Sequence, residues 1–406
     1  MPDDHVPPSD GAGLGDRARH GVPVGPGPAA SALPPEAWAT VLASLEGMGP
    51  RRLRALLGHF GPEGAWSAVR AGGLHRVPAL AEALGPRSAE ISSTWATQAR
   101  QVDPAACWHA HVAAGVGVVV VGHPGYPDGF ADELDPAPIL FHQGDPDVVV
   151  GARVAIVGTR DCTRYGYEVA FDLGRDLTEA GISIVSGLAL GIDGAAHAGA
   201  LEAGSTPPVA VVGSGLDRLY PRRHAGLWRQ VARRGVVWSE YPLGTPAQAW
   251  HFPARNRLIA TLADVVVVVE SHETGGALLT AEQAAARGRP VMAVPGPVRS
   301  AASAGTNRLL AESPGTSMAR DATDVLVALN LEPGSRRTAR ERRPPPGAVD
   351  AGLLHDLGWQ PATLDQLVLR SALDIDLVSA AMVRLELDGW VVQRGGWYER
   401  MAKSGG

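Results

Sequence analysis

The chain has 406 residues, 45% of them hydrophobic, and a formal net charge of −6. At about 100–200 residues per domain, this length predicts two to four domains. The two cysteines, Cys107 and Cys162, exclude a disulfide scaffold and a cysteine-based zinc site. No apolar run reaches the roughly 18–20 residues that cross a membrane. The first residues are acidic and then rich in proline and glycine, unlike a secretory leader, so we expect a cytoplasmic protein.

The charge is spread unevenly. A net charge of −6 taken alone disfavours a nucleic-acid partner. Residues 151–320, however, hold 17 arginines against 14 acids, whereas residues 351–400 hold 4 arginines against 7 acids. Lys403 is the one lysine among 36 basic residues. Any cationic contact with a phosphate is therefore made by arginine, which can bind it through two parallel hydrogen bonds.

The N-terminal third is expected to be a tail followed by helices. Residues 1–34 are rich in proline and glycine, which predicts a disordered tail. Residues 35–103 have helical spacing, and Gly47-Met48-Gly49 separates two apolar stretches. This pattern fits a helix-hairpin-helix or SAM-like domain whose backbone amides approach a phosphate. It fits equally well an ordinary helical hairpin in which the glycines only cap helices.

Residues 104–330 alternate apolar runs with helix-compatible stretches, which predicts an α/β domain. Most of the runs are continuously apolar, as in strands buried on both faces of a parallel sheet. We therefore expect an extended Rossmann-like, doubly wound and mainly parallel sheet. The expected strands are 118–121, 138–141, 154–157, 182–185, 209–212, 236–238, 265–269 and 291–294.

The C-terminal part is expected to be a tether followed by a small domain. Residues 331–350 are rich in arginine and proline, which is typical of a flexible linker. Residues 351–400 show three helical stretches followed by two short strands. This order is typical of a winged helix.

Small polar residues, glycines and arginines follow the expected strands of the α/β domain. Ligands of a doubly wound sheet bind outside the carboxyl ends of its strands, and glycine turns before helices bind anions. The sequence has no G-x-G-x-x-G, no P-loop and no metal-ligand spacing, so we expect no catalytic residue, metal or cofactor. The expected phosphate-binding residues are Gly158, Thr159, Arg160, Tyr165, Gly166, Ser186, Gly187, Gly213, Arg255, Asn256, Arg257, Gly275, Gly276 and Thr280.

Some residues near these turns have a structural interpretation beside the functional one. We interpret Asp193 first as a helix N-cap and His197 as a packed helix histidine rather than a catalytic one. Arg255 and Arg257 lie on different faces of one helix, so at most one or two residues of the Arg255-Asn256-Arg257 trio are expected to point into a site. Tyr165 and Phe252 are the aromatic residues available for base stacking, although a structural role also fits each of them.

The series of motifs resembles the DNA-processing protein A family (DprA, also called Smf) over residues 104–326, and the order of the flanking domains agrees. The motifs are Gly158-Thr159-Arg160 with Tyr165-Gly166, Ser186-Gly187 with Gly191-Ile192-Asp193 and His197, Gly213 and Gly215-Leu216-Asp217 with Tyr220-Pro221, Ser239-Glu240, Phe252-Pro253 with Arg255-Asn256-Arg257, Gly275-Gly276 with Thr280-Ala281, and Val294-Pro295-Gly296 with Gly305-Thr306-Asn307.

The resemblance implies a bacterial cytoplasmic protein that binds single-stranded DNA, forms homodimers and loads the RecA recombinase during natural transformation, without enzymatic activity. It implies that the first turn, Ser186-Gly187, the Arg-Asn-Arg trio and Gly275-Gly276 form the DNA phosphate pocket. Thr159 replaces a more usual serine and keeps the hydroxyl. Leu190 and Ala198 stand where basic residues are common in the family, which lowers the positive charge near the pocket.

An enzyme is the alternative hypothesis. The LOG group of nucleoside-monophosphate phosphoribohydrolases also combines a Rossmann-like sheet with a glycine-rich turn and a glutamate at the sheet edge. In this sequence Glu240 and Glu270 follow expected strands and are the candidates for a general acid or base.

Overall fold

The computed structural model describes residues 33–131, 133, 135–331, 344–358 and 361–401. The expected tail 1–34 lies almost entirely outside these ranges, as does most of the expected linker 331–350. Among the described residues, none of the helices is both long and apolar enough to cross a membrane.

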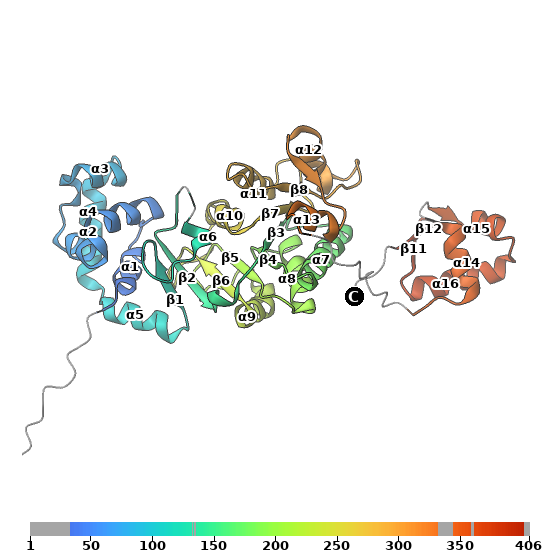
Figure 1. Cartoon of the computed structure of the whole chain (residues 1–406), viewed down its shortest axis with the longest axis horizontal. Helices are drawn as coiled ribbons and strands as arrows, with labels where there is room; N and C mark the ends of the chain where they lie inside the picture. Colours follow the sequence, from blue (N-terminus) through green and yellow to red (C-terminus); the bar gives the residue numbers. More distant parts are fainter. Residues whose placement is uncertain (1–32, 132, 134, 332–343, 359–360, 402–406) are drawn as a thin grey trace, which may run out of the picture. The chain divides into compact units, whose positions relative to one another are not determined.

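The N-terminal region is helical, as predicted (Figure 1). Pro50 occupies the first turn of its longest helix, where the missing amide of proline costs no hydrogen bond. That helix kinks at Gly61, which has a φ of 67° and precedes Pro62. Trp95 is completely buried among the helices. The helices are α1 (Pro35–Ala43), α2 (Pro50–Ala71), α3 (Pro78–Leu84), α4 (Ser88–Gln101) and α5 (Pro104–Ala113).

A nine-stranded sheet forms the centre of the α/β region, in the order β1-β2-β6-β5-β4-β3-β7-β8-β9. The pairs from β6 to β9 are parallel, whereas β1 and β2 join one edge antiparallel. The predicted mainly parallel sheet is thus confirmed, with β9 as an additional strand. The strands are β1 (Gly117–Val120), β2 (Ile139–Gly144), β3 (Arg153–Val157), β4 (Ser183–Ser186), β5 (Val209–Val212), β6 (Val236–Ser239), β7 (Val265–Val268), β8 (Val291–Ala293) and β9 (Thr316–Met318).

Helices cover both faces of this sheet (Figure 1). Alternate residues of each strand point to opposite faces, so Val154 packs with α7, α8 and α13, while Ala155 packs with α10 and α11. Valine runs such as Val265–Val268 are completely buried between the two layers. The helices are α6 (Asp128–Ala131), α7 (Arg164–Glu179), α8 (Ile192–Ala203), α9 (Ala225–Arg234), α10 (His251–Leu262), α11 (Gly276–Ala285), α12 (Ala304–Glu312) and α13 (Ala322–Ala328).

The C-terminal unit is the expected winged helix with one additional strand. Helices α14 (Ala348–Leu357), α15 (Leu364–Ser371) and α16 (Ile375–Leu387) enclose a small apolar core. A three-stranded sheet in the order β10-β12-β11 forms the wing. Its strands are β10 (Ala362–Thr363), β11 (Val391–Arg394) and β12 (Trp397–Arg400).

Candidate functional site

A groove runs along the carboxyl ends of the parallel strands, where a doubly wound sheet binds its ligands. It consists of a cavity of about 690 Å³ and a smaller one of about 30 Å³ beside it. Five residues line both cavities, so we treat the two as one groove. These residues are Arg160, Ala189, Tyr220, Phe252 and Arg255.

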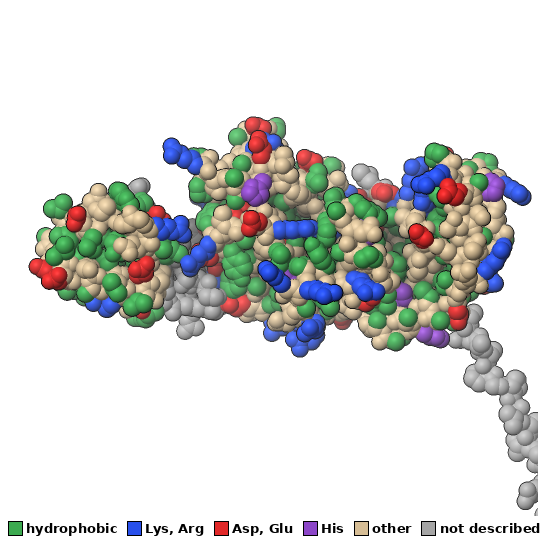
Figure 2. Space-filling model, turned by 180° about the vertical axis from the view of Figure 1, so that it is seen from behind, with side chains coloured by type: hydrophobic (Ala, Val, Ile, Leu, Met, Phe, Trp, Pro, Cys, Tyr) green, Lys and Arg blue, Asp and Glu red, His purple; other side chains and the backbone are tan. Residues whose placement is uncertain are grey.

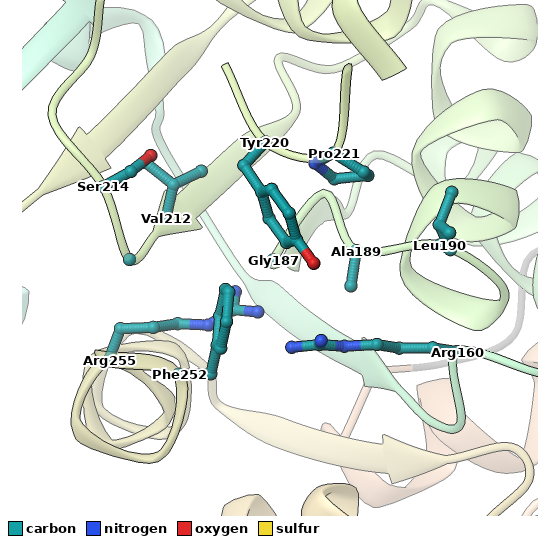
Figure 3. Close-up of a pocket in the computed structure, with 11 residues that line it drawn as sticks. Arg160, Gly187, Ala189, Leu190, Val212, Ser214, Tyr220, Pro221, Phe252 and Arg255 are labelled. Atoms are coloured by element: carbon teal, nitrogen blue, oxygen red, sulfur yellow. The ribbon is translucent and has the colours of Figure 1, made fainter. Parts of the chain in front are cut away.

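Arg160 is the exposed cation of the groove. It follows β3 in the turn before α7, and its guanidinium carbon lies 4.3 Å from the centre of the Phe252 ring. The ring of Tyr220 lies 5.6 Å from that of Phe252. Figure 3 shows Arg160 and Arg255 extending toward each other from opposite sides, with the Phe252 ring overlapping the end of Arg255 in this view. A cation stacked on an aromatic face keeps its N–H donors free for an anion.

Arg255, in contrast, is a buried part of the groove floor. It donates a hydrogen bond to the carbonyl oxygen of Val211 (2.6 Å), and its guanidinium lies 3.8 Å from the carboxylate of Asp193. The same carboxylate accepts the Gly187 amide N–H at 3.1 Å. Burial raises the pKa of Asp193 and lowers that of Arg255, and their mutual attraction opposes both shifts. The two charges largely compensate each other, so the pair fixes the position of the Arg255 guanidinium in the groove floor.

The predicted N-cap role of Asp193 is wrong. Gly191 occupies the N-cap position of α8, and Asp193 lies inside its first turn. Its side chain instead links the β4–α8 loop to Arg255 on α10. The interpretation of His197 as a packed histidine agrees with the structure, because the residue is completely buried and burial lowers its pKa to about 3.

Three of the predicted glycines make room for other parts of the protein. A Cβ on Gly187 would collide with the Arg255 guanidinium, and one on Gly158 would collide with Ile192. A Cβ on Gly166 would collide with the Glu270 carboxylate. At these positions glycine therefore allows close packing of the loops that form the groove.

The first turn is held in place by Glu270. Its carboxylate accepts hydrogen bonds from the Thr163 amide (2.8 Å) and hydroxyl (2.6 Å), and its carbonyl accepts the Thr159 amide (2.8 Å). Thr163 in turn caps α7 by accepting the Gly166 amide. Thr159 and Arg160 are thus presented to the groove by a rigid turn.

The start of α11 lies open at the other side of the groove. Gly275 is its N-cap and no side chain caps the helix, so the amides of Gly276 and Ala277 have no acceptor among the described residues. A Cβ built on Gly276 would have no neighbour within 4 Å. The Asn256 side-chain amide donates to the Gly276 carbonyl at 3.3 Å and fixes this helix start against α10. Thr280, one turn further along, also lines the groove.

The structure brings most of the predicted residues to the groove and leaves four away from its lining. Gly158, Thr159, Arg160, Arg255, Asn256, Gly275, Gly276 and Thr280 line the larger cavity, and Gly187 and Gly213 line the smaller one. Tyr165 donates its hydroxyl to the Pro295 carbonyl, Ser186 donates to the Ile156 carbonyl, Gly166 packs on Glu270, and Arg257 pairs with Glu240.

Sequence reasoning missed Tyr220 and Ala189 as groove residues. Tyr220 follows the end of β5 and is 47% exposed in the lining of both cavities. A tyrosine in the loop that follows an expected strand was the available signal. Ala189 carries no such signal, because its place depends only on the path of the β4–α8 loop.

The comparisons with known proteins agree on one family. The family model for DNA recombination-mediator protein A matches residues 117–330, slightly more than half of the chain. The chain belongs to this family. A second model, for the DprA winged helix domain, matches residues 337–396.

Individual members of the family are similar to this chain in sequence and in fold. Protein Smf of Synechocystis is 31% identical over 90% of this chain and 97% of its own length. DNA processing protein DprA of Bacillus subtilis is 40% identical over 45% of this chain, and the match spans 61% of its own length. The X-ray structure of DNA processing protein A from Streptococcus pneumoniae matches with a TM-score of 0.60 and 29% identity, over 72% of this chain and 97% of that one.

The two glutamates of the enzyme hypothesis are engaged in structural contacts. Glu270 is buried and accepts the two Thr163 donors. Glu240 is buried against Arg257, and burial raises its pKa while Arg257 opposes that shift. Neither carboxylate lines the groove. The family match likewise does not favour the phosphoribohydrolase alternative.

Proposed function

We propose that this chain is a recombination mediator that binds single-stranded DNA in the groove and loads RecA onto it during natural transformation. In this proposal the protein acts in the cytoplasm as a homodimer, protects the incoming strand and catalyses no reaction. The family to which the chain belongs and the chemistry of the groove support this function. The observation that carries it is that the exposed Arg160 and the open start of α11 line the same groove.

The phosphates of the strand would lie between these two features. Arg160 supplies a charged donor with a free face, and the first amides of α11 supply neutral donors aligned with the helix dipole. Arg255 lies in the floor of the groove, where Asp193 compensates its charge and holds its guanidinium in place. None of these groups reads a base, so binding is expected to depend weakly on sequence and strongly on salt.

The bases would contact the apolar side of the groove. Phe252 and Tyr220 present neighbouring rings there, and Tyr220 is the more exposed. Stacking on an aromatic ring tolerates any base because every base has a π-face. A homodimer would hold one long strand at two grooves and gain avidity without new contacts.

Fluorescence anisotropy with a labelled oligonucleotide tests the groove. We expect Arg160→Ala to weaken binding at least about tenfold, because a hydrogen bond to a charged group contributes about 1.5–3 kcal/mol. Arg164→Ala is the matched control, since Arg164 is exposed, pairs with Glu168 at 2.7 Å and lines neither cavity. Equal affinities of the two variants would contradict the proposed site.

A second assay tests the mediator role. RecA is added to single-stranded DNA already covered by a single-strand-binding protein, and ATP hydrolysis by RecA reports filament growth. We expect this chain to shorten the lag before hydrolysis and Arg160→Ala to restore it. An unchanged lag with the wild-type chain would reject RecA loading while leaving DNA binding standing. Incubation with nucleoside monophosphates is expected to release no free base.

A further inference from the structure

A second group of arginines lies beside the groove and is not part of it. Residues 218–234 contain six arginines and no carboxylate. Two of the six have structural partners, since Arg218 pairs with Asp217 and Arg234 donates to the Leu201 carbonyl. The other four are exposed and have no ion-pair or hydrogen-bond partner among the described residues. They are Arg222, Arg223, Arg229 and Arg233.

These four side chains form a row along one continuous stretch of helix. The 3₁₀ helix η3 (Arg222–His224) leads directly into α9, whose Trp228 and Val231 are buried on the sheet. From Arg222 to Arg233 the row extends about 16 Å at the rise of an α-helix. In Figure 2, blue side chains gather at the lower edge of the central part, the height at which Figure 1 labels α9. We call these four residues the α9 track.

The track is attached to the groove. Tyr220 and Pro221, which line the smaller cavity, immediately precede Arg222. His224 forms a hydrogen bond with the Leu188 carbonyl at 3.0 Å, next to the loop residues that line the same cavity. The position of the track relative to Arg160 is therefore fixed by the fold.

Protein stability does not account for this arrangement. Some exposed arginines of the chain neutralise a carboxylate, as Arg164 does with Glu168 and Arg320 with Asp324, whereas the four arginines of the α9 track pair with no carboxylate among the described residues. The helix dipole favours cations in the last turn of α9, where Arg233 lies, but disfavours them before its first turn, where Arg222 and Arg223 lie. Unpaired like charges repel one another. A bound anion would reduce this repulsion between the four arginines, which no residue of their own helix neutralises.

We propose that the α9 track binds the sugar-phosphate backbone of the DNA strand that leaves the groove past Tyr220. This inference rests on the proposed function of the groove and extends its footprint. Guanidinium groups spaced along a surface suit a chain of phosphates rather than a single anion. Single-strand sites of OB folds cover about 4–16 nucleotides. If the groove lies at the lower end of this scale, a short oligonucleotide fills the groove alone and a long one reaches the track.

The test compares oligothymidylates of 6 and 20 nucleotides in fluorescence anisotropy at several salt concentrations. We expect Arg229→Gln/Arg233→Gln to bind the 6-mer like the wild type and the 20-mer about tenfold more weakly. The slope of log affinity against log salt for the 20-mer should become shallower by about 1.4, at about 0.7 per lost phosphate contact. The control is Arg70→Gln/Arg289→Gln, which removes two arginines outside the track and should change neither oligonucleotide.

The outcomes separate this inference from the proposed function. If the double variant binds the 20-mer with wild-type affinity and slope, the track is not part of the site, although the groove can still bind DNA. If both oligonucleotides lose affinity equally, the arginines act on the groove and the extended footprint is wrong. If the wild-type chain binds neither oligonucleotide, both the proposed function and the track are rejected.

Discussion

The groove of the α/β region and the winged helix use their charged residues in different ways. In the groove, Arg160 stacks on the Phe252 ring and forms no ion pair or side-chain hydrogen bond with another described residue, and the start of α11 has no capping side chain. In the winged helix, Arg384 pairs with Asp350 at 2.7 Å, and Arg370 donates to a backbone carbonyl. The first region thus keeps donors for an anion, whereas these two arginines of the second region donate within their own fold.

The exposed face of α16 likewise differs from the groove, because it presents few cations. A winged helix that reads DNA would present cations on this helix, but here the exposed positions include Asp376 and Glu386 together with Leu377, Val383 and Leu387. Residues 351–400 carry 4 arginines and 7 acids. The comparison teaches that the fold of a unit does not decide its partner, and that unpaired donors are the better guide.

The largest expected effect is on the free energy of unfolding when the Asp193–Arg255 pair of the groove or the Asp350–Arg384 pair of the winged helix is broken. Asp193→Ala should destabilise the α/β region by about 3–5 kcal/mol, because it leaves the buried Arg255 charge without its partner. Asp350→Ala in the winged helix should cost much less, because Arg384 is half exposed and water replaces the lost contact. Denaturant unfolding of both variants measures the difference. Similar losses would mean that the Asp193–Arg255 pair is not a structural part of the groove.

A smaller effect is expected from pH. The folded-state pKa of His197 is about 3, well below the ordinary value, so the folded protein binds no proton there while the unfolded chain does. Its stabilising contribution is complete above about pH 6.5 and is lost as the pH falls toward 3. Between pH 6.5 and 5 the loss amounts to about 2 kcal/mol.

Denaturant unfolding at these two pH values checks this prediction. The loss should disappear in His197→Gln and persist in His355→Gln, since His355 is an exposed residue of the winged helix. If His197→Gln loses as much stability between pH 6.5 and 5 as the wild type, titratable groups other than His197 cause the loss.

The smallest expected effect is a gain of DNA affinity. Leu190 lines the smaller cavity, so Leu190→Arg adds a cation to the groove and should tighten oligonucleotide binding by about threefold, a contribution of roughly 0.7 kcal/mol. Leu387→Arg, on the exposed face of α16, adds the same charge to the winged helix and should leave the affinity unchanged. Anisotropy at low salt measures both. If Leu387→Arg increases the affinity and Leu190→Arg does not, the DNA binds to the winged helix rather than to the groove.

Much of the sheet could be predicted because buried parallel strands produce continuous apolar runs. Val209–Val212 was predicted with its observed bounds, and the other expected strands of the parallel sheet shift by one residue at most at each end. β9 escaped prediction because Thr316–Met318 is short and not buried. Local sequence determines a strand well only when both of its faces are covered.

The groove could be predicted only in part. Strand ends and glycines indicated which loops meet, and helical spacing separated Arg255 from Arg257. The sequence did not show that Arg255 reaches across Gly187 to Asp193, since this contact depends on how α8 and α10 pack at the sheet edge. Nor did it show that Arg257 is held by Glu240. Contacts between distant segments decided which predicted residues remained available to a ligand.

Photocrosslinking tests the central claim most directly. An oligonucleotide that carries 5-iododeoxyuridine is bound to the full chain, irradiated, and the attached peptides are identified by mass spectrometry. If the groove holds the strand, the crosslinks fall on Tyr220 and Phe252. Crosslinks confined to residues 344–401, with none in the loops that line the groove, would contradict the account.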